Sequence, residues 1–257
     1  MTTTAILSAL AEEQHGLLAL LQDPKPVRRA GRAFWVGALH GRPVVLALSR
    51  IGKVAAATTA TALIEAFAAD RIVFTGVAGA LGAGVNVGDL VVATHFVQHD
   101  MDASPLFPRF EVPLYRQSLF TCDAGLTSLL FEASRHCLDT AAHRTGQDRA
   151  CAVHQGLIAS GDSFIATAPA STALKRALQS VGMEPLAVEM EGAAVAQVCH
   201  DYGVPFAAVR TISDRADEHA PMDFQRFVAD VAGAYALRIV ERLLGALPLH
   251  PGAGRAG

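Results

Sequence analysis

The chain has 257 residues, of which 51% are hydrophobic and 18% charged, with a formal net charge of −3 at pH 7. This balance predicts one compact domain with a sizeable core rather than a disordered chain, and the absence of a basic run argues against nucleic acid as the main partner. No apolar run reaches the length of a membrane span, and the four cysteines lack C-x-x-C or metal-ligand spacing, which is typical of reduced thiols in a cytoplasmic protein.

The first half of the chain alternates short apolar runs with helical segments, which is typical of an α/β fold. In chain order we expect a strand at 5–10, a helix at 11–22, a hairpin of strands at 32–39 and 44–49, a helix at 55–68, and strands at 71–74 and 90–98. The glycine-rich stretch 75–84 is expected to be a loop whose backbone amides can approach a ligand closely. It is neither a P-loop nor a dinucleotide-binding fingerprint.

The second half begins with a long irregular segment at 99–120, and such loops are often lids or binding walls. We then expect a helix at 126–137, a strand at 152–160, a helix at 168–179, a strand at 186–188, a helix to Tyr202, a strand at 206–212, a loop with Phe224 and a last helix to about Leu247. The tail, residues 248–257, has prolines, glycines and no core pattern, and is predicted to be disordered. Residues 1–247 are predicted to form the single domain.

Carboxylates follow two predicted strands that one helix joins into a βαβ-type unit. Glu189 and Glu191 follow the first of these strands, and Asp214 follows the second. Because ligands of open α/β sheets bind beyond the carboxyl ends of the strands, these acids predict a site. A single acid there is often only a helix cap. For Glu13, which follows the first strand of the chain, capping and a role in the site both stay open.

Several short blocks, in order along the chain, resemble one family. They are I-G-K-V at 51–54, T-G-V-A-G at 75–79, V-G-D-L-V-V at 87–92, S-G-D-S-F-I at 160–165, V-E-M-E-G-A-A at 188–194 and I-S-D at 212–214. Together they are similar to the 5'-methylthioadenosine/S-adenosylhomocysteine nucleosidases of the nucleoside phosphorylase superfamily. The pair V-E-M-E and S-D is specific, whereas each other block alone is a weak signal.

The resemblance implies a single α/β domain with a mixed, barrel-like central sheet flanked by helices. It implies hydrolysis of the N-glycosidic bond of an adenine nucleoside with a 5'-thioether, releasing adenine and a 5'-thioribose, in the cytoplasm and in methionine salvage. Breaking this bond builds positive charge on the sugar and negative charge on the base. The reaction therefore needs an acid at the base and a general base for water, but no metal or redox cofactor.

The resemblance assigns this chemistry to three acids. Glu13 matches the residue that activates water, Glu191 the one that holds the ribose hydroxyls, and Asp214 the one that gives a proton to adenine N7. Phe164 matches the ring that stacks on the base. The matched substrate-binding positions are Leu10, Ile51, Val77, Ala78, Gly79, Phe164, Ile165, Glu189, Met190, Ser213 and Phe224, of which Leu10, Ile51 and Phe224 line the alkylthio pocket.

Three alternatives and several departures from the family pattern remain at this point. A phosphorylase would use phosphate and need an arginine-rich pocket, a related hydrolase would act on another adenine nucleoside, and a purine-binding module would have no turnover. Val77 stands where the family often has serine, and Arg50 stands where a small residue is common. Apolar groups at Phe224 and in the 101–114 loop predict a homodimer that completes the 5' pocket.

Overall fold

The computed structural model describes residues 2–140, 150–227 and 231–248. Its strands are β1 Thr4–Ser8, β2 Gln22–Arg29, β3 Arg32–Leu39, β4 Arg42–Leu48, β5 Arg71–Ala80, β6 Leu90–Gln98, β7 Leu119–Thr121, β8 Val153–Ser160, β9 Pro185–Glu189 and β10 Phe206–Asp214. Its helices are α1 Ala11–Leu20, α2 Lys53–Phe67, α3 Ala124–Thr140, α4 Ala168–Gln179, α5 Gly192–Tyr202, α6 Ala220–Phe227 and α7 Gly233–Ala246. The predicted disordered tail lies outside the described residues, apart from residue 248.

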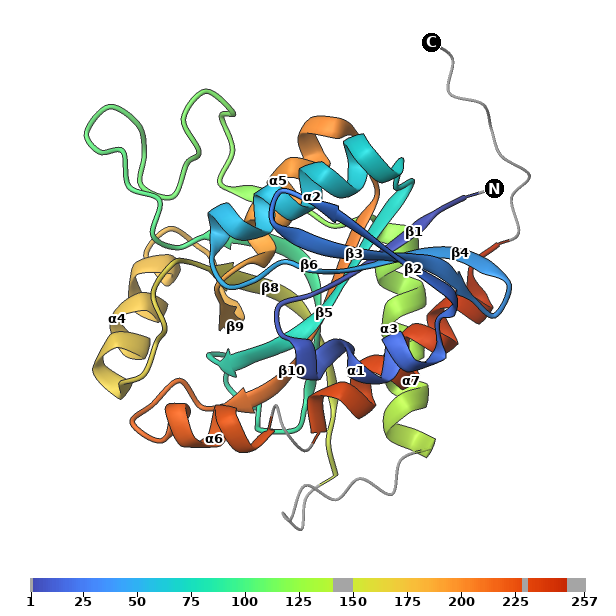
Figure 1. Cartoon of the computed structure of the whole chain (residues 1–257). Helices are drawn as coiled ribbons and strands as arrows, with labels where there is room; N and C mark the ends of the chain where they lie inside the picture. Colours follow the sequence, from blue (N-terminus) through green and yellow to red (C-terminus); the bar gives the residue numbers. More distant parts are fainter. Residues whose placement is uncertain (1, 141–149, 228–230, 249–257) are drawn as a thin grey trace.

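The strands form one mixed sheet that closes on itself (Figure 1). The order β10-β6-β8-β9-β5 returns to β10, because β5 also pairs with β10 along most of its length. From β5 the sheet continues outward through β1, β4, β3 and β2, and β7 pairs with β6. The sheet contains parallel pairs such as β5–β10 and antiparallel pairs such as β6–β10. The predicted α/β fold with a mixed, barrel-like sheet flanked by helices is confirmed.

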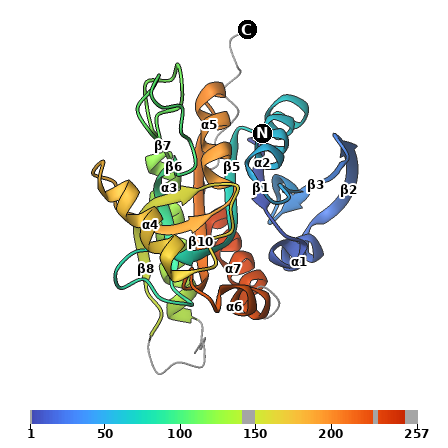
Figure 2. The same ribbon diagram turned by 90° about the vertical axis from the view of Figure 1, so that its left-hand side faces the viewer.

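Alternate residues of the strands are buried on opposite faces of the sheet. In β1, Ala5 and Leu7 pack in the core that includes α2 and α5, whereas Ile6 packs in the core that includes α1, α3 and α7. The two sets of helices lie on different sides of the strands in Figures 1 and 2. Burial on both faces explains why these strands read as unbroken apolar runs in the sequence. None of the described helices is long and apolar enough to cross a membrane.

Three local expectations were wrong. Residues 75–80, expected to be a loop, continue β5. β2 was not expected, because its two prolines lack the N–H that a central strand needs, but it is an exposed edge strand where proline is tolerated. Phe224 lies in the helix α6 and not in a loop. This helix was not expected because it is short and shows only a brief periodic pattern in the sequence.

The expected βαβ unit was also wrong, although α5 does connect β9 to β10. β9 pairs with β5 in antiparallel fashion and β10 pairs with β5 in parallel fashion, so β9 and β10 lie on opposite edges of β5 and run in opposite directions. Val188 of β9 and Asp214 of β10 nevertheless both lie opposite Gly79 of β5. This shared register at Gly79, and not a parallel crossover, brings the acids near the ends of β9 and β10 together.

Candidate active site

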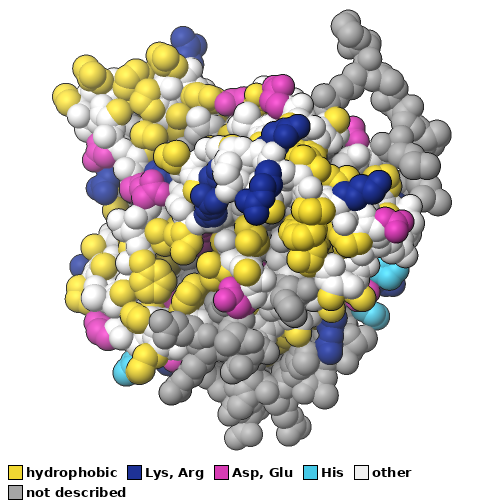
Figure 3. Space-filling view, in the orientation of Figure 1, with side chains coloured by type: hydrophobic (Ala, Val, Ile, Leu, Met, Phe, Trp, Pro, Cys, Tyr) yellow, Lys and Arg dark blue, Asp and Glu magenta, His cyan; other side chains and the backbone are white. Residues whose placement is uncertain are grey.

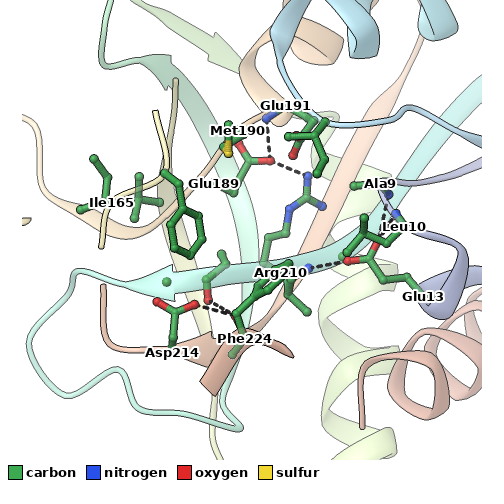
Figure 4. A pocket seen from close by; sticks show the side chains of 18 of the residues that line it. Ala9, Leu10, Glu13, Ile165, Glu189, Met190, Glu191, Arg210, Asp214 and Phe224 are labelled. Atoms are coloured by element: carbon green, nitrogen blue, oxygen red, sulfur yellow. Dashed lines mark hydrogen bonds and ion pairs between the residues drawn. The ribbon is translucent and has the colours of Figure 1, made fainter. Parts of the chain in front are cut away.

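A cavity of about 350 Å³ lies where β1, β5, β9 and β10 end (Figure 4). The sequence-predicted site residues that line it are Leu10, Glu13, Ile51, Val77, Ala78, Gly79, Phe164, Ile165, Glu189, Met190, Glu191, Ser213, Asp214 and Phe224. The structure therefore brings every predicted position to one cavity. Figure 4 shows Glu13 and Asp214 at opposite sides of it, with Glu189 and Glu191 at a third side.

Glu13 is buried in the first turn of α1 and is held by backbone donors. The N–H groups of Ala9 and Leu10 donate to Oε2 at 2.8 and 3.0 Å, and the N–H of Val77 donates to Oε1 at 3.2 Å. Oε1 therefore keeps acceptor capacity for a further donor. Burial raises the pKa of Glu13, although the backbone donors and the charge of Arg210 act in the opposite direction. Glu13 caps α1 and also lines the cavity, so capping does not exclude a role in the site.

Glu189 lines the cavity, but its oxygens are occupied by the protein. Arg210 Nη2 donates to Oε2 at 2.8 Å, the N–H of Gly192 donates to Oε1 at 2.9 Å, and the hydroxyl of Ser160 also donates to Oε1. The N–H of Glu191 donates to Oε2 at 3.2 Å. Glu189 thus anchors the start of α5 to β8 and β10, and has little acceptor capacity left for a ligand.

Glu191 is the least satisfied of the acids. It is buried at the start of α5, and among the described residues only the N–H of Gly52, 2.8 Å from Oε1, donates to its side chain. Burial, and then the charge of neighbouring Glu189, raise the pKa of Glu191 to about 8. Its surroundings therefore favour the protonated form more than those of an exposed glutamate do, and this carboxyl can exchange hydrogen bonds with hydroxyl groups of a ligand.

Asp214 ends β10 and is almost fully buried. The N–H of Ala216 donates to Oδ1 and the hydroxyl of Ser213 donates to Oδ2, both at 2.8 Å. A Cβ at Gly79 would lie 2.8 Å from Oδ1, so the close approach of β5 to this carboxyl requires glycine. Burial raises the pKa of Asp214, and the charges of Asp223 and Asp217 act in the same direction. A proton on this group is therefore easier to keep near neutral pH than on an exposed aspartate.

The remaining walls of the cavity are apolar. The rings of Phe164 and Phe224 meet edge to face with centroids 5.9 Å apart. Phe164 is 46% exposed and Ile51 is 57% exposed, so both present apolar surface toward the open side of the cavity. A flat aromatic ligand can stack on such a ring, and an apolar substituent can lie against Ile51.

The cavity also has lining residues that the sequence reasoning missed: Ala9, Phe74, Gly76, Ser163, Val188 and Arg210. Arg210 is the most important of them, since it is 1% exposed and pairs with Glu189. Its signal in the sequence was a charged residue inside the otherwise apolar run of β10, which is rare unless a buried partner compensates the charge. No group of three potential metal ligands occurs among the described residues.

Comparisons with known proteins show the family of the chain. A family model of the phosphorylase superfamily matches residues 3–245. The 5'-methylthioadenosine/S-adenosylhomocysteine nucleosidase of Actinobacillus succinogenes is 38% identical over 224 residues, covering 87% of this chain and 90% of that protein. The aminodeoxyfutalosine nucleosidase of Helicobacter pylori is 37% identical over 231 residues, covering 89% of this chain and 92% of that protein.

A solved structure agrees over nearly the whole chain. The 5'-methylthioadenosine/S-adenosylhomocysteine nucleosidase of Neisseria meningitidis, in complex with methylthio-immucillin-A, superposes with a TM-score of 0.85 at 35% identity, covering 96% of this chain and 100% of that one. The chain belongs to the phosphorylase superfamily and, within it, to the nucleosidases related to 5'-methylthioadenosine/S-adenosylhomocysteine nucleosidase.

Proposed function

We propose that this protein hydrolyses the N-glycosidic bond of 5'-methylthioadenosine and S-adenosylhomocysteine, releasing adenine and the corresponding 5'-thioribose. The observation that carries the proposal is the placement of Glu13 and Asp214 on opposite sides of one cavity (Figure 4). Cleavage of a glycosidic bond needs a proton at the leaving base and a base that activates water at the sugar. The relatives named above act on nucleosides of this kind, as their names state.

In this proposal Asp214 is the acid and Phe164 stacks on adenine. Asp214 keeps its proton until the bond to the sugar weakens, because burial raises its pKa, and then passes that proton to N7 of the base. Glu13 is the base that takes a proton from water. The hydrogen bonds that Glu13 accepts from Ala9, Leu10 and Val77 hold the carboxylate in one orientation toward the cavity.

Glu191 is placed to hold the ribose hydroxyls in the same proposal. The single hydrogen bond that its side chain accepts within the described residues, from the N–H of Gly52, leaves capacity for a diol. The transition state carries positive charge on the sugar, and this charge favours the ionised form of Glu191 over its protonated form. Met190, beside Glu191, supplies apolar contact to the sugar ring.

Water suits this cavity better than phosphate as the nucleophile. Among the described residues that line it, Arg210 is the only Lys or Arg, whereas Glu13, Glu189, Glu191 and Asp214 are all acids. The guanidinium is already engaged by Glu189 and by the carbonyl oxygens of Phe74 and Val209. A phosphate dianion would therefore meet several carboxyl groups and one cation that is already paired.

We expect adenine release from 5'-methylthioadenosine to proceed at the same rate with and without phosphate, and to yield a free reducing sugar. The physical reason is the acidic cavity just described. The measurement is adenine formation by the purified protein, with chromatographic identification of the sugar. Dependence on phosphate, with a ribose 1-phosphate as product, would instead identify a phosphorylase.

A hydrolase of another adenine nucleoside is the second candidate. The Helicobacter pylori aminodeoxyfutalosine nucleosidase is nearly as similar to this chain as the first relative, and exposed Ile51 leaves the cavity open on its side. Comparing kcat/KM for 5'-methylthioadenosine, S-adenosylhomocysteine and adenine nucleosides with other 5' groups in one assay separates the two candidates.

We also propose that the protein is a homodimer whose partner covers the open side of the cavity. Leu106 and Leu114 are 84% and 86% exposed, and Val54 at the start of α2 is 78% exposed. Figure 3 shows hydrophobic side chains gathered at the upper left of the molecule, where Figure 1 places the loop after β6. Such apolar surface is unusual on a monomer.

We expect light scattering to give the mass of a dimer for the wild-type protein. The double substitution Leu106→Glu and Leu114→Glu is expected to give a monomer with a raised KM, because charge in an apolar interface is costly. Glu132→Ala, which removes an exposed pair with Arg135 on α3, is the control and is expected to stay dimeric. A monomeric wild-type protein with full activity at high dilution would contradict the dimer.

The proposal takes residues 1–247 as the nucleosidase domain, which agrees with the extent of the family match. It places the reaction in the cytoplasm and in methionine salvage, as the resemblance implies. It requires no metal or redox cofactor, because proton transfer and attack by water account for every step.

A further inference from the structure

Two carboxylates from distant parts of the chain share the N-terminus of α2. The N–H of Gly52 donates to Glu191 Oε1 at 2.8 Å, and the N–H of Lys53 donates to Asp162 Oδ1 at 2.7 Å. Gly52 is the N-cap of α2, and no side-chain cap is present there. The helix therefore depends on the two acids for its first N–H groups. One of these acids lines the cavity, and the other lies two residues before Phe164.

Asp162 is part of a closed ring of contacts between three segments. The ammonium group of Lys53 donates to Asp100 Oδ1 at 2.5 Å, and the N–H of Asp162 donates to Asp100 Oδ2 at 2.9 Å. With the bond from the Lys53 N–H to Asp162, these contacts connect the start of α2, the residues after β6 and the residues after β8 (Figure 1). We name this arrangement the Lys53–Asp100–Asp162 ring.

The ring is a partly buried feature. The Lys53 side chain is 14% exposed, and its ammonium group also donates to Gln98 Oε1 at 3.1 Å. Gln98 in turn donates to Gln197 of α5, the helix that Glu191 begins. Burial favours the neutral form of Asp100, but the bonds from Lys53 and the Asp162 N–H outweigh it and hold the pKa below its ordinary value. Charge-assisted hydrogen bonds of this kind are stronger than neutral ones.

Besides the ring, the segment is held by the N–H of Gly161, which donates to the carbonyl oxygen of Glu189 at 3.1 Å, and by Ile165, which packs against an apolar cluster that includes Val188. Residues 161–166, which include the cavity-lining residues Ser163, Phe164 and Ile165, lie in neither helix nor strand. Behind them the imidazole of His99 packs against Gly161 so closely that a side chain at 161 would collide with it. On the cavity side, Phe164 meets the ring of Phe224. Asp162 therefore supplies the connection between this wall and α2.

We propose that the Lys53–Asp100–Asp162 ring is a positioning device for the reaction. It holds the wall that carries Phe164 at a set distance from Glu191, because Asp162 of this wall and Glu191 accept hydrogen bonds from adjacent N–H groups at the start of α2. Lys53 and Asp162 are positioning residues that touch neither base nor sugar. The inference rests on the proposed function, in which Phe164 stacks on adenine while Glu191 holds the ribose. Small displacements between such groups lower rates strongly.

The test is a set of substitutions read by kinetics and by binding. Asp162→Ala is expected to lower kcat/KM for 5'-methylthioadenosine by about tenfold or more, because the stacking ring and the sugar-holding acid lose their common support. The affinity for adenine, measured by calorimetry, is expected to fall by less than about threefold, because adenine reaches Phe164 without needing Glu191. A purely structural role of Asp162 would lower the melting temperature without producing this split.

Conservative variants sharpen the test. Asp162→Asn keeps an acceptor for the Lys53 N–H and is expected to recover most of the lost kcat/KM. Lys53→Met keeps the stem and removes the ammonium group, and is expected to resemble Asp162→Ala. Combining Lys53→Met with Asp162→Ala is expected to cost little more than either alone, since both open the same ring. Glu132→Ala is the control, with wild-type kcat/KM expected.

Each outcome decides the inference. Wild-type kcat/KM in Asp162→Ala, or an equal loss of adenine affinity and kcat/KM, would overturn the positioning role. If the wild-type protein binds adenine but cleaves no nucleoside, the proposed function fails. The positioning role is then tested by the ratio of the affinities for adenine and for 5'-methylthioadenosine. Asp162→Ala is expected to weaken binding of the nucleoside more than binding of adenine. An unchanged ratio would refute the positioning role.

Discussion

Asp214→Asn is expected to lower kcat for adenine release by about a hundredfold or more, the scale of a general-acid contribution. Adenine leaves poorly as an anion, so N7 needs a proton as the bond breaks. Asparagine keeps the shape of the side chain and can still accept the hydrogen bond from the N–H of Ala216, but it has no acidic proton to give. The affinity for a substrate analogue is expected to fall far less than kcat.

The same substitution has an expected effect on stability that depends on pH. Because burial raises the pKa of Asp214 in the folded state, the folded protein loses stability as pH rises from the ordinary aspartate range through the raised value. Asparagine does not ionise, so Asp214→Asn is expected to unfold at a higher temperature than the wild type above that range. If Asp214 only capped the turn, asparagine would instead lower the melting temperature slightly and leave kcat nearly intact.

The matched control is Asp217→Asn, three residues further along the chain. Asp217 Oδ1 accepts a hydrogen bond from the N–H of His219 and does not line the cavity. This variant is expected to lower kcat far less than Asp214→Asn does, because it removes one charge that raises the pKa of Asp214 but leaves the proton donor in place. Near-normal turnover of Asp214→Asn, measured on the same preparation as its melting temperature, would remove Asp214 from the mechanism.

Arg210→Met is expected to lower the free energy of unfolding by about 3–5 kcal/mol, the cost of leaving a buried charge without its partner. Arg210 and Glu189 are 1% and 3% exposed in their side chains, and the distance from Nη2 to Oε2 is 2.8 Å. The guanidinium also lies 4.0 Å from the centroid of the Phe74 ring. Methionine fills much of the volume, so most of the loss is expected to come from the unpaired carboxylate (Figure 4).

The double variant Arg210→Met with Glu189→Gln separates charge from packing. If the unpaired charge dominates, the double variant is expected to recover a large part of the lost stability, because a glutamine can still accept hydrogen bonds without a charge. Urea unfolding of the wild type, of Arg210→Met, of Glu189→Gln and of the double variant measures this coupling. Arg135→Met, which breaks an exposed pair with Glu132, is the control and is expected to change stability by less than about 1 kcal/mol. No recovery in the double variant would mean that packing is the main cause.

Helices with strong local signals could be predicted from the sequence almost to the residue. The helix expected at 168–179 is α4, Ala168–Gln179, and the hydroxyl of Thr167 caps it by accepting the N–H of Ala170 at 3.3 Å. Capping and the 3.6-residue period are properties of neighbouring residues, so they are visible without the fold.

The glycines at 76 and 79 show where local reasoning failed. They were interpreted as parts of a loop, but they lie within β5. A Cβ at Gly76 would lie 3.3 Å from Glu13 Oε1, and one at Gly79 would lie 2.8 Å from Asp214 Oδ1. These glycines therefore allow two distant carboxyl groups to approach the strand, a requirement that only the tertiary neighbours create.

By itself the sequence determined most of the helices and strands, and which acids follow strand ends, because these features depend on residues close together in the chain. Only the tertiary structure decided that β9 and β10 run in opposite directions and meet at Gly79, that Arg210 pairs with Glu189, and that burial raises the pKa of Glu191. Strand pairing joins residues far apart in sequence, and a pKa depends on what surrounds the group in space. Neither strand pairing nor a pKa can therefore be predicted from a local sequence pattern.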